Sequence, residues 1–161
     1  MTIYQGRVSG YSHDGAGVIA GDDLVIFVPG ALKGELVAYS LPTEADKLKE
    51  SRKSKKRQTA FGFLEEILEP AVQRAEPKCP YYGSCGGCSL QHASYDHQLE
   101  IKKEIVERAF RGLGSEISEK IEVLPVLGDN NPWQYRNKGI FALQRQKGRV
   151  KIGFYEKKSR Q

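Results

Sequence analysis

The sequence contains no apolar stretch that approaches the roughly 18 residues a bilayer-spanning helix needs. Residues 1–5 also lack the basic stretch followed by an apolar run that marks a secretory signal. Cysteine is scarce, and its count of three is odd. These absences argue against a membrane protein and a disulfide framework, so we expect a cytoplasmic protein whose thiols bind metal. No internal repeat is present.

The charge of the chain is concentrated in one segment. The 161 residues allow one domain or two small ones, and they carry a net charge of +5. Residues 46–57, DKLKESRKSKKR, hold seven Lys or Arg against two acids, which is also a net +5, so the rest of the chain is neutral overall. A solvated loop would explain this segment. An arm that contacts phosphates would explain it too, because each cation that meets a phosphate releases counterions and adds affinity. Our candidate RNA-binding residues are Arg7, Arg52, Lys53, Lys55, Lys56 and Arg57.

The first part of the chain alternates short apolar runs with glycine turns. This pattern predicts five strands, at residues 4–11, 18–20, 24–28, 35–41 and 58–68. Five short strands with tight turns indicate a small closed barrel of the oligonucleotide-binding type. Closure removes exposed strand edges, and the basic segment joins the fourth strand to the fifth. We therefore assign residues 1–70 to an OB-like RNA-binding barrel.

All three cysteines lie in residues 79–92, CPYYGSCGGCSLQH, with the spacing C-x5-C-x2-C. Thiolates are soft ligands that suit zinc or an iron–sulfur cluster, and the glycines of this loop allow its backbone to curl around a metal. Three thiols do not complete a four-ligand shell. A fourth cysteine outside this chain could complete it, His92 could complete a zinc site, or the thiols could bind no metal. The candidate metal ligands are Cys79, Cys85 and Cys88, with His92 if the metal is zinc.

The rest of the chain predicts a helix and a hairpin. Ser94 is suited to an N-cap, and an amphipathic pattern of about 18 residues follows, ended by Gly112 and Gly114. We expect its apolar stripe to face the core along Leu99, Val106, Phe110 and Leu113, with Ile101, Ile105 and Ala109 adjoining it. Residues 135–143 and 149–155 predict a β-hairpin. Residues 71–161 thus form an incomplete α+β second domain, and the fold class as a whole is mainly β.

Several stretches together resemble the N-terminal part of bacterial RNA uracil-5-methyltransferases, most closely the 23S ribosomal RNA type. Residues 15–18 and 25–35 look like the TRAM domain of that family, and residues 79–80, 85–88 and 90–92 look like its iron–sulfur loop. Gln98, Leu99 and Lys102 fit the helix that follows this loop. Residues 135–138 and 153–155 look like its central domain. The cysteine loop is the most specific of these matches. The TRAM stretch is shared with other RNA-modifying enzymes.

The resemblance implies a 4Fe-4S cluster held by Cys79, Cys85, Cys88 and a fourth cysteine shortly beyond Gln161. It implies 23S rRNA as the partner and methyl transfer from S-adenosylmethionine to C5 of a uracil. In that family a cysteine thiolate attacks C6 of a base taken out of its stack, and a carboxylate removes the C5 proton. The cofactor-binding and catalytic domain is not in this chain. We therefore assign no catalytic residue, expect S-adenosylmethionine only in a complete enzyme, and predict an inactive monomer. The alternative is a stand-alone zinc-binding RNA adaptor.

Overall fold

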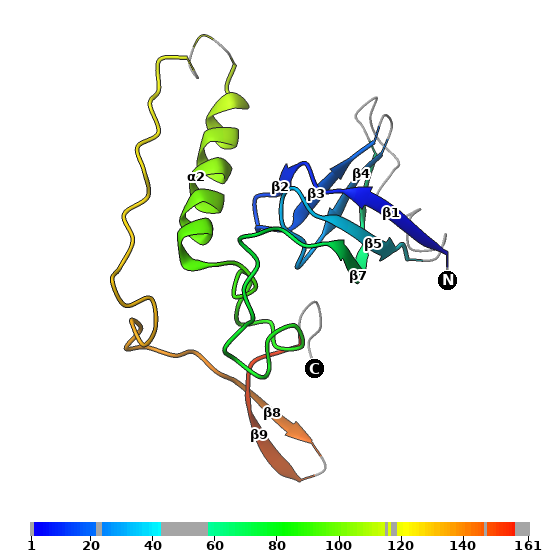
Figure 1. Cartoon of the computed structure of the whole chain (residues 1–161). Helices are drawn as coiled ribbons and strands as arrows, with labels where there is room; N and C mark the ends of the chain where they lie inside the picture. Colours follow the sequence, from blue (N-terminus) through cyan, green and yellow to red (C-terminus); the bar gives the residue numbers. More distant parts are fainter. Residues whose placement is uncertain are drawn as a thin grey trace.

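The computed structural model describes residues 2–21, 24–42, 58–114, 116, 119–146 and 148–156. Within these ranges the chain is mainly β with one long helix, as the sequence predicts (Figure 1). The elements in chain order are β1 (Ile3–Arg7), β2 (Gly10–Tyr11), β3 (Gly17–Ala20), β4 (Leu24–Val28), β5 (Leu36–Ser40), β6 (Gln58–Phe61), β7 (Phe63–Glu69), α2 (Tyr95–Arg111), β8 (Ala142–Gln146) and β9 (Arg149–Gly153). The predicted basic arm lies outside the described residues.

The strands of the first part pair into two sheets. One has the order β1-β5-β7 and the other β2-β3-β4-β6, with β4 and β6 parallel and the remaining pairs antiparallel. The fifth predicted strand is divided at Gly62, whose N–H donates to the carbonyl of Phe27 at 2.8 Å. A Cβ at that position would lie 3.1 Å from the Tyr39 ring, so only glycine fits this crossing easily. The strands in the described ranges therefore form two open sheets. The predicted closed five-stranded barrel is not seen among these residues.

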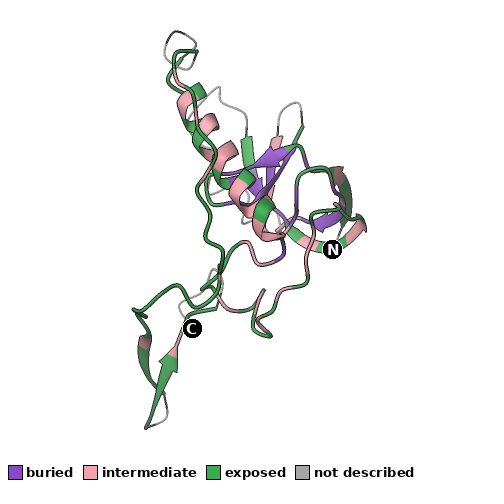
Figure 2. Ribbon diagram, turned by 60° about the vertical axis from the view of Figure 1, so that its left-hand side comes forward, coloured by how far each residue is buried: buried purple, intermediate pink, exposed green. Residues whose placement is uncertain are grey.

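A first hydrophobic core joins these two sheets. Val28 and Val37 have no exposed surface, and Tyr39 is 5% exposed. The other buried members are Val8, Ile19, Ile26 and Ala31. Full burial of each large apolar side chain contributes about 1.5–3 kcal/mol. This core makes the strands before residue 70 one β unit, and Figure 2 shows that buried residues gather there.

A second core joins the β unit to the helix. Tyr11 and Leu32 from the β unit pack with Ala93 and with Ile101 of α2. The helix begins after Ser94 and ends before Gly112, close to the predicted bounds, although the Ser94 side chain makes no capping hydrogen bond. The predicted apolar side does meet the core, but the contact falls on its adjoining residues Ile101 and Ile105 and not along its centre. Ile101 is the fully buried helix residue, because it meets Tyr11 and Leu32.

Two members of the predicted stripe are exposed, and one of them, Leu113, lies beyond the last residue of α2. Val106 is 42% exposed and Leu113 is 58% exposed. Residues 121–141 follow without helix or strand; the first part of this stretch returns alongside α2 and the last part leads to the hairpin (Figure 1). The N–H of Asp129 donates to the Tyr95 hydroxyl at 2.8 Å, which ties this return to the start of the helix. Within the described residues, no helix combines the length and hydropathy that crossing a bilayer requires.

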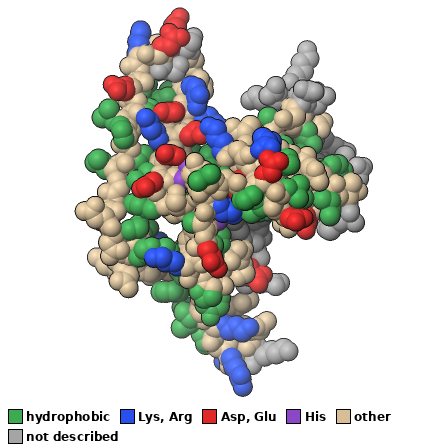
Figure 3. Space-filling view, in the orientation of Figure 1, with side chains coloured by type: hydrophobic (Ala, Val, Ile, Leu, Met, Phe, Trp, Pro, Cys, Tyr) green, Lys and Arg blue, Asp and Glu red, His purple; other side chains and the backbone are tan. Residues whose placement is uncertain are grey.

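The predicted hairpin is present as β8 and β9, although its first strand begins seven residues later than expected, at Ala142. The register places Leu143 opposite Ile152 and Arg145 opposite Val150, so these alternate residues share one side of the hairpin, which is apolar except at Arg145. We name this side the hairpin face; its apolar members are all more than half exposed, and they are Phe141, Leu143, Val150, Ile152 and Phe154. Hydrophobic side chains are also visible at the surface near the base of the hairpin (Figure 3).

Candidate functional site

The cysteine loop is closed at its base by two antiparallel segments. The N–H of Ala75 donates to the carbonyl of His92 at 2.9 Å, and the N–H of Ser94 donates to the carbonyl of Gln73 at 2.9 Å. Arg74 and Ala93 form the β-bridge between these bonds. The two ends of the loop are therefore held side by side, although 18 residues lie between Arg74 and Ala93 in the sequence.

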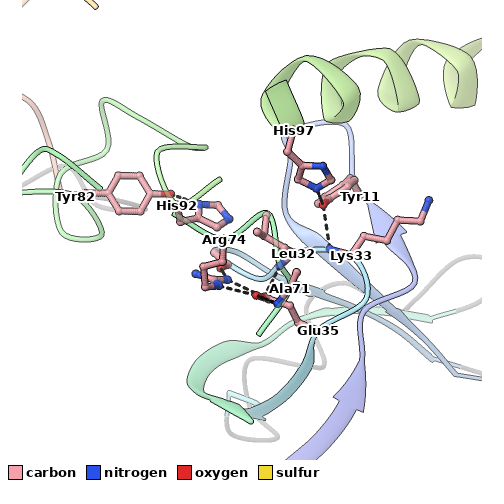
Figure 4. A network of polar contacts seen from close by, with 10 residues as sticks. Tyr11, Leu32, Lys33, Glu35, Ala71, Arg74, Tyr82, His92 and His97 are labelled. Atoms are coloured by element: carbon pink, nitrogen blue, oxygen red, sulfur yellow. Dashed lines mark hydrogen bonds and ion pairs between the residues drawn. The ribbon is translucent and has the colours of Figure 1, made fainter. Parts of the chain in front are cut away.

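A buried ion pair fastens this base to the β unit (Figure 4). Glu35 is fully buried, and its Oε1 accepts from Nε of Arg74 at 2.6 Å while its Oε2 accepts from Nη2 at 2.7 Å. The same carboxylate accepts the N–H groups of Leu32 at 2.7 Å and Ala71 at 3.1 Å. Nη2 of Arg74 also donates to the carbonyl of Gly30 at 2.7 Å. A bidentate pair with additional hydrogen bonds is the arrangement in which a buried charge is tolerated.

The carboxyl group of Glu35 is ionised in this setting. Burial alone would raise its pKa, but the hydrogen bonds from Arg74, Leu32 and Ala71 together with the Arg74 charge outweigh burial and lower the pKa below its ordinary value. Both charges are therefore present near neutral pH. The base of the cysteine loop is thus held by an ion pair in which Glu35 and Arg74 each make further hydrogen bonds to the backbone.

A second polar network fastens the start of α2 to the β unit. The Tyr11 hydroxyl accepts the N–H of Lys33 at 3.0 Å and lies 2.8 Å from Nε2 of His97. Nδ1 of His97 lies 2.7 Å from Oε2 of Glu100. A His97 tautomer with its proton on Nδ1 donates to Glu100 and accepts from Tyr11, which satisfies both contacts. Burial raises the pKa of Tyr11 to about 12, so its hydroxyl keeps the proton that this network uses.

His92 lies on the β-unit side of the cysteine loop. It is 2% exposed, and its Nδ1 is 2.5 Å from the hydroxyl of Tyr82, which also donates to the carbonyl of Ser89 at 2.8 Å. Burial raises the pKa of Tyr82, so this hydroxyl is neutral near pH 7. The structure therefore shows His92 in contact with Tyr82. Its role as a zinc ligand is still only a prediction.

The three cysteines are free thiols in a loop of consecutive turns. Cys79 and Cys85 are partly buried, and Cys88 is exposed. The N–H of Gly87 donates to Sγ of Cys85 at 3.4 Å. Across the ranges that the structure describes, no group of three or more His, Cys, Asp or Glu side chains is gathered as a metal site. The donor chemistry fits a soft metal, whereas the described loop does not bring the sulfurs together by itself.

The last described residues return to this loop. The N–H of Gly86 donates to the carbonyl of Tyr155 at 2.9 Å, and Cys85 forms an antiparallel bridge with Glu156. A Cβ on Gly87 would lie 3.7 Å from the ring of Phe154, so this glycine also lies against the same segment. The chain is therefore beside the central cysteine as it reaches residue 156.

The predicted RNA-binding residues are placed only in part. Arg7 is described: its side chain is 56% exposed, donates to the carbonyl of Gly34 at 2.7 Å and pairs with Glu69 at 2.5 Å. The other five candidates fall outside the described residues, and these are Arg52, Lys53, Lys55, Lys56 and Arg57. Their role in RNA binding is untested by the structure.

Sequence reasoning did not identify the groups that fasten the loop and the helix. Glu35 precedes an apolar strand and Arg74 lies in a linker, and nothing in their spacing pairs them. His97 lies in the first turn of α2, and nothing in its spacing indicates its contact with Tyr11. A lone acid directly after a glycine turn and before a buried strand is a weak signal that could have indicated Glu35.

These observations define a class: a small β unit with a basic segment, locked to a cysteine loop by a buried ion pair. Known family profiles give no match to the chain. Several individual proteins are nevertheless similar to it in sequence. A protein of Listeria innocua named an uncharacterized RNA methyltransferase is 38% identical over 148 residues, which are 92% of this chain and 30% of that protein. A similarly named protein of Halalkalibacterium halodurans is 34% identical over 98% of this chain and 31% of its own length.

A third relative has a more specific name. The 23S rRNA (uracil(1939)-C(5))-methyltransferase RlmD of Alkalilimnicola ehrlichii is 35% identical over 154 residues, 94% of this chain and 32% of that protein. The chain is thus homologous to a part of the RNA methyltransferases, and the resemblance identified from the sequence is confirmed. The chain spans 30–32% of the length of these three curated relatives.

Proposed function

We propose that this chain is the RNA-binding and cluster-holding N-terminal portion of an RNA uracil-C5 methyltransferase that acts on 23S rRNA. The observation that carries the proposal is the match of 92–98% of the chain to proteins named RNA methyltransferases, one of them a 23S rRNA uracil-C5 enzyme. The finer fold assignment, a TRAM barrel of the OB type, belongs to the same proposal. It is supported by the two short-stranded sheets that share one core.

The residues of this chain bind and orient RNA and take no part in methyl transfer. The cations of residues 46–57 contact phosphates, which contributes affinity without sequence preference. The Glu35–Arg74 pair and the Tyr11–His97 contact keep the cysteine loop and α2 at a fixed distance from the β unit. Orientation of this kind matters to catalysis because a small misplacement of a reactant lowers the rate greatly.

Cys79, Cys85 and Cys88 would supply three thiolates to a 4Fe-4S cluster, whose bound form gives the loop a rigid inorganic centre. The fourth thiolate comes from sequence beyond this chain. The contact of residues 155–156 with Cys85 and Gly86 supports this assignment, since it places the last described residue beside a candidate ligand. The Gly87 N–H bond to Cys85 supports it as well.

The RNA part is tested by fluorescence anisotropy with a labelled fragment of 23S rRNA across a series of salt concentrations. We expect binding whose logarithm falls linearly with the logarithm of salt concentration, as counterion release requires. A chain that does not bind this fragment at low salt contradicts the proposal.

The cluster part is tested by anaerobic purification followed by iron, sulfide and zinc analysis. In protein that continues through the fourth cysteine, we expect a brown colour with iron and sulfide, and their loss in Cys85→Ser. Serine replaces sulfur by a hard oxygen ligand at nearly constant volume. Colourless protein with stoichiometric zinc would instead support the zinc-binding adaptor.

A further inference from the structure

The part of the chain that leads into the hairpin and forms it is rich in cations and contains no acid. Residues 130–155 hold six Lys or Arg and no Asp or Glu, so their net charge is +6. Five of these cations lie in the described ranges and all five are exposed; they are Arg136, Lys138, Arg145, Arg149 and Lys151. The overall neutrality of the chain outside residues 46–57 therefore conceals a second positive stretch, which acids elsewhere offset.

The helix α2 shows what a merely solvated charged surface of this protein is like. Its 17 residues carry four acids and four Lys or Arg. Lys103 pairs with Glu107 at 3.7 Å, and Glu104 pairs with Lys33 at 2.8 Å. Within the described part of the chain, no ion pair involves a cation of residues 130–155. A solvated face mixes the two signs of charge as α2 does, so the unbalanced hairpin requires another explanation.

The register of the hairpin separates its polar residues from its apolar ones. Gln144 lies opposite Lys151, and Gln146 lies opposite Arg149. Because successive side chains of a strand point to opposite sides, these four lie on the side away from the hairpin face. We name them the basic side, and all four are exposed. Lys and Arg side chains are seen over the hairpin at the lower end of the molecule in Figure 3.

The base of the hairpin is held in place beside the cysteine loop. The N–H of Gly86 donates to the carbonyl of Tyr155 at 2.9 Å. The rings of Phe141 and Phe154, which flank the two strands, have centroids 5.1 Å apart. The basic side is thus presented on paired strands with an anchored base. Groups that are already ordered lose less conformational freedom on binding, so a contact made there retains more of its energy.

The chemistry of the basic side matches the backbone of a nucleic acid. A guanidinium such as that of Arg149 can bind a phosphate through two parallel hydrogen bonds, and the Lys151 ammonium acts as a point charge. The side-chain amides of Gln144 and Gln146 can donate to phosphate oxygens as well. The four residues include no carboxylate that would repel a polyanion.

We propose that the basic side of the β8–β9 hairpin, formed by Gln144, Gln146, Arg149 and Lys151, binds the phosphate backbone of RNA. The inference rests on the proposed function and adds to it a second phosphate-binding surface, separate from residues 46–57 and next to the cysteine loop. Contacts of this kind fix the position of the RNA and carry no sequence preference. RNA held there lies close to the candidate cluster ligands.

The test measures binding of the full chain to a labelled single-stranded fragment of 23S rRNA by fluorescence anisotropy at several salt concentrations. Arg149→Gln/Lys151→Gln removes two phosphate contacts, and each contributes about 0.7 to the slope of log affinity against log salt. We expect the magnitude of this slope to fall by about 1.4. The loss of affinity should therefore be about 7-fold greater at 50 mM than at 200 mM salt.

Lys102→Gln/Lys103→Gln is the matched control, because it removes the same charge from α2. Lys102 is exposed, and Lys103 pairs with Glu107, so neither change removes a contact with the core. The control should keep the wild-type salt slope. Equal changes of slope in the two double variants would show an effect of total charge alone and would overturn the hairpin as the binding surface.

Gly153 offers a second, independent test. It lies opposite Ala142 on the basic side, and an added Cβ would have no heavy atom within 4 Å, so Gly153→Glu and Gly153→Gln should both fold. The glutamate variant should bind more weakly than the glutamine variant, by a factor about 3-fold larger at 50 mM than at 200 mM salt, as for one lost phosphate contact.

Equal affinities of the two Gly153 variants would overturn the proposal. An unchanged salt slope in Arg149→Gln/Lys151→Gln would overturn it too and would assign the basic side to another partner, such as an acidic polypeptide. Failure of the wild-type chain to bind any RNA would instead contradict the proposed function itself.

Discussion

The buried Glu35–Arg74 pair should dominate the stability of the junction between the β unit and the cysteine loop. Glu35→Gln removes the charge and keeps one oxygen, which can accept from either Leu32 or Ala71, because these two N–H groups donate to different oxygens of the carboxylate. It leaves the Arg74 guanidinium, whose side chain is 21% exposed, facing an amide that cannot neutralise it. Removal of one partner of a buried pair costs about 3–5 kcal/mol, so we expect a loss of this size in the free energy of unfolding.

Arg74→Met makes the complementary perturbation. Glu35 then keeps its burial and loses the cation, so its pKa should rise above the ordinary value. A raised pKa contributes stability that is present below the unfolded-state pKa and lost as pH rises through the folded-state value. The wild-type carboxyl has a lowered pKa, and its contribution is present above pH 4.5 and lost as pH falls below that value. The stability difference between the two proteins should therefore shrink as pH falls from 7 toward 4.

Urea denaturation followed by far-ultraviolet circular dichroism measures these differences. Glu69→Gln is the control, because it breaks the Arg7–Glu69 pair, whose side chains are 56% and 58% exposed, and should cost at most about 1 kcal/mol. The double variant Glu35→Gln/Arg74→Met should cost less than the sum of the single variants by about 1–3 kcal/mol. Equal losses in Glu35→Gln and Glu69→Gln, or additive single variants, would refute the reasoning.

Three further predictions follow from other features. The stability of Tyr11→Phe relative to wild type should increase between pH 10 and about 12. The raised pKa of Tyr11 stabilises the wild-type fold below pH 10, and this contribution is lost as pH rises through the folded-state pKa. Chemical denaturation at several pH values measures the difference, and unfolding free energies that fall in parallel for the two proteins would contradict the prediction. Neutralising Lys53, Lys55, Lys56 and Arg57 to glutamine should reduce the magnitude of the salt slope for single-stranded RNA by up to about 3, and an unchanged slope would exclude these residues as phosphate contacts. Leu143→Gln with Ile152→Gln should reduce the binding of a dye that reports exposed apolar surface and leave the melting temperature nearly unchanged, because each side chain is 69% exposed. Dye fluorescence and thermal melting test this, and a large drop in melting temperature would show that the hairpin face is covered.

The strands and the helix could be predicted because their signals are local. Glycine turns and apolar runs predicted strands near β3, β4 and β5, and Ser94 with Gly112 predicted the limits of α2. The predicted ends of the strands were wrong where a contact with residues distant in the sequence decides them. Gly62 divides β6 from β7 because the Tyr39 ring and the Phe27 carbonyl meet it there, and neither neighbour is close in sequence.

The candidate site was predictable in chemistry but not in geometry. The spacing of the cysteines indicates a soft metal, yet the turns that would gather the sulfurs depend on a ligand or on further chain. The apolar period of α2 predicts that one side is buried. Tyr11 and Leu32 decide that this side is centred on Ile101, and their position depends on how the sheets pack.

The second hydrophobic core also decides where this protein can be divided. Tyr11 and Leu32 are 1% and 0% exposed because Ala93 and Ile101 cover them. Excision of residues 1–70 as a minimal piece would expose both side chains and leave the Glu35 carboxylate buried without its guanidinium. A cut beyond Gly114 keeps the helix that covers them, so the smallest portion able to stand alone in solution should run through α2.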